Sequence, residues 1–119
     1  MGAPASTDLQ SFKAGFFKAL GHPLRIRILE VLRTRERSVQ DLQSRLDLDQ
    51  STVSQQLAVL RAKNIVTARK EGTTVRYTIR DALVGDLLDV ARRIFNNQLA
   101  GTQTMLRALR QEARRPARR

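Results

Sequence analysis

The sequence predicts a mainly α-helical (α+β) domain that carries one two-stranded β-hairpin. Along most of the chain, apolar residues recur every three or four positions, which is the spacing of one helix face. Only over residues 65–79 does the period change to two, where Val75, Tyr77 and Ile79 alternate with polar residues. A chain of 119 residues, 41% of them hydrophobic, fits one domain with a modest core.

Gly21-His22-Pro23 separates the first two predicted helices, over residues 8–20 and 23–33. Proline lacks an N–H and disfavours helical geometry in the residue before it, yet it suits the first turn of a new helix. His22 is the only histidine of the chain. Because it lies in this turn, we expect it to have a structural role.

Two further helices follow, the first of them short and beginning after Ser38, a typical capping residue. Asp49 or Ser51 can cap the next helix, over residues 50–63. The inward stripe of that helix is Val53, Leu57 and Leu60. The sequence therefore places a polar helix face opposite this stripe.

A strand, a turn at Glu71-Gly72-Thr73-Thr74 and a second strand are predicted next, and then a helix over residues 83–99. Asp81 is a candidate cap for this helix, which carries a broad apolar band. We expect residues 1–7 to be a flexible N-terminus, residues 8–106 to form the domain, and the basic residues 107–119 to be a disordered tail. This order of elements is that of a winged helix-turn-helix with N- and C-terminal dimerisation helices.

The net charge of +11 is unevenly placed. Residues 50–80 and 107–119 each sum to +5, whereas residues 82–106 are neutral. A polyanion is the natural partner of such a chain, and double-stranded DNA is the first candidate. With no cysteine and one histidine, the chain lacks disulfides, thiolate nucleophiles and sulfur-ligated zinc sites. No constellation of catalytic residues stands out, so neither an enzyme nor a cofactor is expected.

The outer face of helix 50–63 is small, polar and uncharged near its start, as a helix in the major groove requires. The amide of Gln55 can pair bidentately with adenine, and the first turn offers N–H groups to a phosphate. The predicted DNA-reading residues are Gln50, Ser51, Thr52, Ser54, Gln55 and Arg61. The hairpin adds a basic wing along the DNA backbone or minor groove. Its predicted contacts are Arg69, Lys70, Thr73, Thr74 and Arg76.

Three segments resemble the ArsR/SmtB family of bacterial regulators over about residues 9–99. The run Phe17-Lys18-Ala19-Leu20-Gly21-His22-Pro23-Leu24-Arg25-Ile26-Arg27-Ile28-Leu29 is similar to the family's opening, Gln50 to Leu60 resembles its recognition helix, and Arg69 to Tyr77 resembles its wing. The resemblance implies a homodimer that binds operator DNA and responds to an effector. Gln56 departs from it, since many members have histidine there.

The apolar band of residues 83–99 and the phenylalanine-rich first helix are expected to pack across a two-fold axis, because left uncovered they form a large apolar patch. The alternative is that both cover the core of one subunit. The predicted dimer interface is Phe12, Phe16, Leu87, Leu88, Ala91, Ile94 and Phe95.

Both metal sites that the family resemblance implies lack their ligands, since Ser38 and Gln40 stand at one, and only Asp81 is suited to ligation at the other. No metal site is therefore predicted, although Asp86 and Asp89 with symmetry mates remain a candidate. The leading hypothesis is a cytoplasmic, sequence-specific regulator without a membrane partner. The alternatives are a nickel- or zinc-responsive regulator with an unusual site or a metal-binding partner, a non-specific architectural DNA-binding protein, and a protein-interaction module. An effector-binding partner protein is a further candidate.

Overall fold

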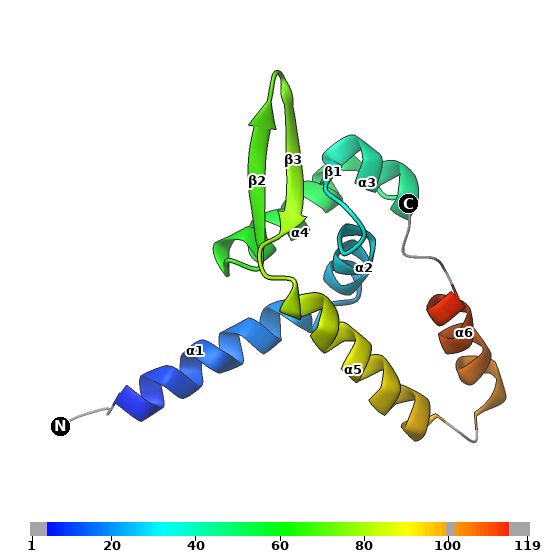
Figure 1. Ribbon diagram of the computed structural model, residues 1–119. Coiled ribbons are helices and arrows are strands. Elements are labelled where there is room, and N and C mark those ends of the chain that lie inside the picture. Colours follow the sequence, from blue (N-terminus) through cyan, green and yellow to red (C-terminus); the bar gives the residue numbers. More distant parts are fainter. Residues whose placement is uncertain (1–4, 100–101, 115–119) are drawn as a thin grey trace.

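Six helices and three short strands make up the computed structural model, which describes residues 5–99 and 102–114 (Figure 1). In chain order they are α1 (Ala5–Leu20), α2 (Pro23–Leu32), β1 (Arg37–Ser38), α3 (Val39–Leu46), α4 (Gln50–Ala62), β2 (Val66–Glu71), β3 (Thr74–Ile79), α5 (Leu83–Gln98) and α6 (Gln103–Arg114). The mainly α winged helix-turn-helix fold is confirmed. Among the described helices, none is both long and apolar enough to cross a membrane.

Helices α2, α3 and α4 pack around one apolar core. Ile65 and Val66, where β2 begins, also contribute buried side chains to it. The predicted inward stripe of α4, Val53, Leu57 and Leu60, is confirmed. The most deeply buried side chains are Ile28, Leu29, Leu42, Val53, Leu57, Leu60, Ile65 and Val66. Burial of these side chains supplies most of the free energy that holds the three helices together.

Side-chain caps set where α2 and α3 begin. The imidazole Nδ1 of His22 accepts a hydrogen bond from the backbone N–H of Leu24 at 3.1 Å, and Pro23 occupies the first turn of α2. Ser38 accepts from the N–H of Asp41 at 3.1 Å. The only histidine of the chain therefore serves as a helix cap.

The sheet has three antiparallel strands in the order β1-β3-β2, one more than the two-stranded hairpin that the sequence predicts. Arg37 pairs with Tyr77 and Ser38 with Arg76, while β2 and β3 pair from Val66 with Ile79 to Glu71 with Thr74. The sequence does not predict β1, because two residues are too few to show the alternation of apolar and polar side chains that marks a strand. It joins the start of α3 to the hairpin.

Both ends of the chain differ from expectation. Helix α1 begins at Ala5, inside the segment 1–7 expected to be flexible, and α6 continues to Arg114, inside the segment 107–119 expected to be disordered. No proline or glycine interrupts residues 103–114, and Ala, Leu, Gln and Arg are strong helix formers. The basic composition of this segment hides its helical spacing. Residues 1–4 and 115–119 lie outside the described part of the chain.

A bidentate ion pair joins α5 to α2. The guanidinium of Arg33 donates from Nη1 and Nη2 to the two carboxylate oxygens of Asp89, each at 2.6 Å. These hydrogen bonds lower the pKa of Asp89, and they raise the pKa of Arg33. Since α5 extends well away from the core in Figure 1, this pair fixes the direction in which α5 leaves the domain.

We expect Asp89→Asn to lower the free energy of unfolding at pH 7 by about 1 kcal/mol or less, because solvent screens a carboxylate that is 45% exposed. The lowered pKa means that the stabilisation is present above the unfolded pKa of Asp89, near 4, and is lost as pH falls through the folded value. Urea unfolding between pH 7 and pH 3 measures this difference. Asp86→Asn is the control, since it removes the same charge from α5 without the hydrogen bonds; an equal effect of both variants would contradict the prediction.

Candidate nucleic-acid interface

Helix α4 presents the polar face that the sequence predicts. Because Val53, Leu57 and Leu60 are buried, the opposite side chains point to solvent. Of the predicted DNA-reading residues, Thr52 is half-buried and the others are exposed: Gln50, Ser51, Ser54, Gln55 and Arg61. The structure therefore brings these residues together on one accessible surface, which we call the α4 face.

Asp49 caps α4 and changes the electrostatics of its first turn. Its carboxylate accepts hydrogen bonds from the backbone N–H of Thr52 at 2.8 Å and from the hydroxyl of Ser51 at 3.3 Å. The bonds from Thr52 and Ser51 lower the pKa of Asp49. One of the N–H groups that the sequence offers to a phosphate is therefore already used, and the first turn carries a negative charge.

Arg25 holds α4 against the first two helices. Its Nε donates to the carbonyl of Ala19 at 2.6 Å, its Nη2 to that of Lys18 at 3.4 Å, and its Nη1 to Oε1 of Gln56 at 2.8 Å. One guanidinium thus binds two carbonyls in the last turn of α1 and the half-buried Gln56 of α4. Sequence reasoning misses this contact, because no local pattern relates Arg25 to a residue 31 positions away.

The hairpin projects beyond the core as a narrow two-stranded arm (Figure 1). Gly72 has a φ of +63° at the first central position of the two-residue loop, where a type II′ turn requires a positive value. Arg69 and Arg76 are direct cross-strand partners, a repulsive arrangement unless counter-charges lie nearby. Glu71 supplies one, 2.9 Å from Arg76 and 3.7 Å from Arg69.

Glu36, which the sequence does not mark as functional, pairs with Arg69 and raises its pKa. Two of the three predicted wing cations are therefore held in ion pairs. Lys70 and Thr73 are exposed, and no ion pair with Lys70 occurs in the described residues.

A small cavity of about 300 Å³ lies between the hairpin, α3 and the start of α4. Gln50, Thr73 and Thr74, three predicted DNA contacts, line it together with Gln40 and Gln43 of α3. The structure thus brings the start of α4 and the wing to a common polar surface. Gln40 and Gln43 are not among the predicted DNA contacts, because the sequence shows them only as polar positions of a short helix.

The predicted dimer residues lie on α1 and α5. Phe12 is 77% exposed, and Ile94 and Phe95 are about half exposed, whereas Phe16, Leu87 and Leu88 pack partly against the core. Ala91 is half-buried. The set therefore divides into an exposed apolar surface and a group that also serves the subunit's own core.

The candidate metal ligands have other contacts. Asp89 binds Arg33, and Asp81 accepts a hydrogen bond from the N–H of Leu83 at 2.9 Å. Across the ranges 5–99 and 102–114, no three His, Cys, Asp or Glu side chains are grouped so that they could hold a metal ion.

Comparison with known proteins finds bacterial regulatory proteins in each case. The family model described as "Bacterial regulatory protein, arsR family" matches residues 22–68. The chain is 44% identical to an uncharacterized HTH-type transcriptional regulator of Mycobacterium tuberculosis, Rv0081, over 88% of this chain and 93% of the relative. It is 41% identical to the transcriptional activator HlyU of Vibrio cholerae, over 66% of this chain and 72% of the relative.

Solved structures show the same fold. The crystal structure of Rv0081 matches with a TM-score of 0.72 and 46% identity, covering 77% of this chain and 93% of that one. A Mycobacterium bovis structure, described as a homodimeric winged helix-turn-helix DNA-binding domain, matches with a TM-score of 0.75 and 28% identity, covering 82% of this chain and 91% of that one.

We expect Gly72→Ala to lower the free energy of unfolding by about 1 kcal/mol, because alanine is strained at positive φ. No atom lies within 4 Å of the added Cβ, so a steric clash does not contribute. Chemical denaturation measures the change, with Thr73→Ala as the control in the same loop. A loss below a few tenths of a kcal/mol would show that the loop adopts another turn without cost.

Proposed function

The chain belongs to the ArsR family of bacterial regulatory proteins, and from this premise we propose that it is a sequence-specific DNA-binding transcriptional regulator that acts as a homodimer on operator DNA. The observation that carries the proposal is the α4 face, a polar surface of short side chains with one cation, Arg61, near its end, held in place by a fully buried apolar stripe. A rigid helix with short side chains allows its backbone to approach a groove closely.

Gln55 is the residue that we assign to base reading. It is exposed in the second turn of α4, and Ser51 and Ser54 beside it are short enough to leave its amide unobstructed. A glutamine amide can donate to N7 and accept from N6 of adenine at the same time. The hydroxyls of Ser51, Thr52 and Ser54 suit either bases or phosphates.

The wing supplies backbone contacts in this proposal. Lys70 and Thr73 are exposed and can approach phosphates directly. Arg69 and Arg76 already bind Glu36 and Glu71, so a phosphate must compete with these carboxylates. The gain from each arginine is therefore smaller than the gain from a free cation.

The exposed apolar surface of α1 and α5 supports the dimer. Phe12, Ile94 and Phe95 are large, apolar and at least about half exposed, which is costly for a monomer in water. Two copies related by a two-fold axis would place two α4 helices on one palindromic site, with half-sites about one DNA turn apart.

We expect Gln55→Ala to weaken binding to the operator duplex about tenfold or more while leaving binding to a scrambled duplex unchanged. The reason is that one bidentate base contact contributes about 1–3 kcal/mol of discrimination. Fluorescence anisotropy with both duplexes at fixed salt measures the ratio, and the operator is first selected from random duplexes.

Arg76→Ala is the control for that experiment, because loss of a backbone contact should weaken binding to both duplexes alike and reduce the salt slope by at most about 1, since Arg76 is shared with Glu71. If Gln55→Ala lowers both affinities equally, Gln55 does not read a base. If the wild-type chain binds no duplex selectively, the proposed function itself is wrong.

We expect Phe95→Asp to raise the dimer dissociation constant about 100-fold or more, because it buries an unpaired carboxylate in an apolar contact. Sedimentation velocity over a concentration series measures the monomer fraction. Asn97→Asp introduces the same charge at an exposed polar position of α5 and should change little. Equal dissociation of both variants would place the dimer contact elsewhere.

A further inference from the structure

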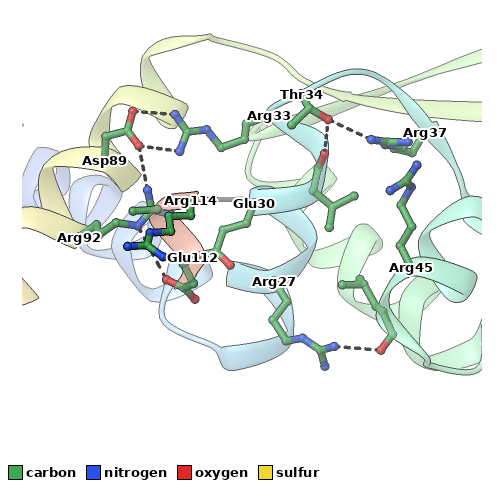
Figure 2. Close-up of a pocket in the computed structure, with 13 residues that line it drawn as sticks. Arg27, Glu30, Arg33, Thr34, Arg37, Arg45, Asp89, Arg92, Glu112 and Arg114 are labelled. Carbon is green, nitrogen blue, oxygen red and sulfur yellow. Dashed lines mark hydrogen bonds and ion pairs between the residues drawn. The ribbon is translucent and has the colours of Figure 1, made fainter. Parts of the chain in front are cut away.

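A second basic surface surrounds a cavity of about 710 Å³ between α2, the end of α3, α5 and α6 (Figure 2). Six arginines line it: Arg27, Arg33, Arg37, Arg45, Arg92 and Arg114. None of its lining residues belongs to α4 or to the hairpin. The cavity is therefore separate from the α4 face and from the wing.

Positive charge exceeds negative charge in this cavity. Its lining carboxylates are Glu30, Asp89 and Glu112, and Asp41 beside the cavity pairs with Arg37 at 3.0 Å and with Arg45 at 3.3 Å. Six guanidiniums are therefore accompanied by four carboxylates. Asp89 binds Arg33 at 2.6 Å and lies 3.4 Å from Arg92, and Glu112 lies 3.8 Å from Arg92. Arg92 therefore shares Asp89 with Arg33 and has only a long contact with Glu112.

Two of the arginines have no carboxylate partner within residues 5–99 and 102–114. Arg27 donates from Nη2 to the carbonyl of Leu46 at 2.9 Å, which leaves the rest of its guanidinium without a bond. Arg114, in the last turn of α6, makes no hydrogen bond or ion pair with any other described residue. Figure 2 places Arg92 and Arg114 on one side of the cavity and Arg37 and Arg45 on the other, with Arg27 between them.

Unsatisfied donors also gather here. In the described part of the chain, the only buried side-chain nitrogen or oxygen atoms without a hydrogen-bond partner are Nε of Arg37 and Nε of Arg92. Arg37 is only 3% exposed, so water does not compensate for its unpaired donor. Both arginines line this cavity, and Nε of Arg92 has only the 3.8 Å ion pair with Glu112, which is too long for a hydrogen bond. Buried donors without partners are unusual enough to indicate a missing acceptor.

We propose that this cavity binds a compact oxyanion that carries at least two negative charges on phosphate or carboxylate groups. The planar guanidinium matches these groups bidentately, and several arginines around one cavity can share a multivalent anion. The volume lies within the range of small-molecule sites. A monovalent ion would neutralise too little of the surrounding charge to compete with Asp89 and Glu112.

Binding at this cavity weakens operator binding, a consequence that rests on the proposed function. The anion competes with Asp89 for Arg33 and Arg92, and so loosens the pair that fixes α5 to α2. Because α5 carries the proposed dimer contact and α2 packs against α4, the spacing of the two α4 helices becomes less well defined. DNA binding must then also restore this spacing, which costs free energy and lowers the affinity for the operator.

The site is tested by calorimetric titration of the full chain at constant ionic strength, with sodium pyrophosphate as the phosphate probe and sodium citrate as the carboxylate probe. We expect saturable binding with one site per chain for at least one probe, and the responding probe identifies the anionic group. Absence of saturable binding for both probes would overturn the proposal.

Arg114→Gln and Arg27→Gln should each weaken the bound probe about tenfold, the value of one lost charge-assisted contact. Arg114 is the safer variant, since no described contact depends on it. Arg107→Gln on α6 and Arg35→Gln after α2 remove the same charge outside the cavity and should change affinity less than about twofold. Equal losses in all four variants would show a general charge effect and overturn the site.

Duplex binding without any probe separates the anion from DNA as the occupant. If Arg114→Gln and Arg27→Gln weaken scrambled-duplex binding as strongly as probe binding, these arginines contact DNA and the proposal is wrong. With the probe present, operator affinity should fall about fivefold or more. Probe binding without this change would refute the regulatory consequence alone, and probe binding in a chain that binds no operator would refute the proposed function alone.

Discussion

Burial of one side of α4 is the constraint on which the rest of the structure depends. Val53, Leu57 and Leu60 are fully enclosed by residues of α2, α3 and β2, so α4 cannot rotate about its axis without exposing them to water. A helix with 3.6 residues per turn then has one outward face, and here that face is polar and short. The cap at Asp49 and the bond from Arg25 to Gln56 refine this orientation but do not create it.

The count of 22 lysine and arginine side chains overstates how many are free to bind a polyanion. Arg25 and Arg27 donate to the carbonyls of Ala19 and Leu46, at the ends of α1 and α3, where cations are favoured by the helix dipole. Arg33, Arg69 and Arg76 are held by carboxylates. Several arginines therefore connect elements of the fold, and Arg25 and Arg33 attach helices α1 and α5 to α2.

Local patterns predict the long elements of this chain and miss the contacts between distant ones. The sequence predicts the helix periods, the caps at Ser38 and Asp49 and the Gly72 turn, because each depends on residues only a few positions apart. Strand β1 is too short to show a period, and the arginines of α6 hide a helix in a segment that resembles a charged tail. The Arg25–Gln56 and Arg69–Glu36 contacts span 31 and 33 residues, so only the folded chain reveals them.

The bonds from Arg25 to Lys18 and Ala19 have a consequence for how this chain can diverge. They anchor the final turn of α1, whereas its other end projects away from the other helices in Figure 1. An insertion before Phe12 only lengthens this projecting end. An insertion between Phe12 and Lys18 turns Phe12 by about 100° relative to that anchor and removes it from any shared surface. Length variation among descendants of this sequence should therefore accumulate upstream of Phe12, and the segment from Phe12 to Ala19 should keep a constant number of residues.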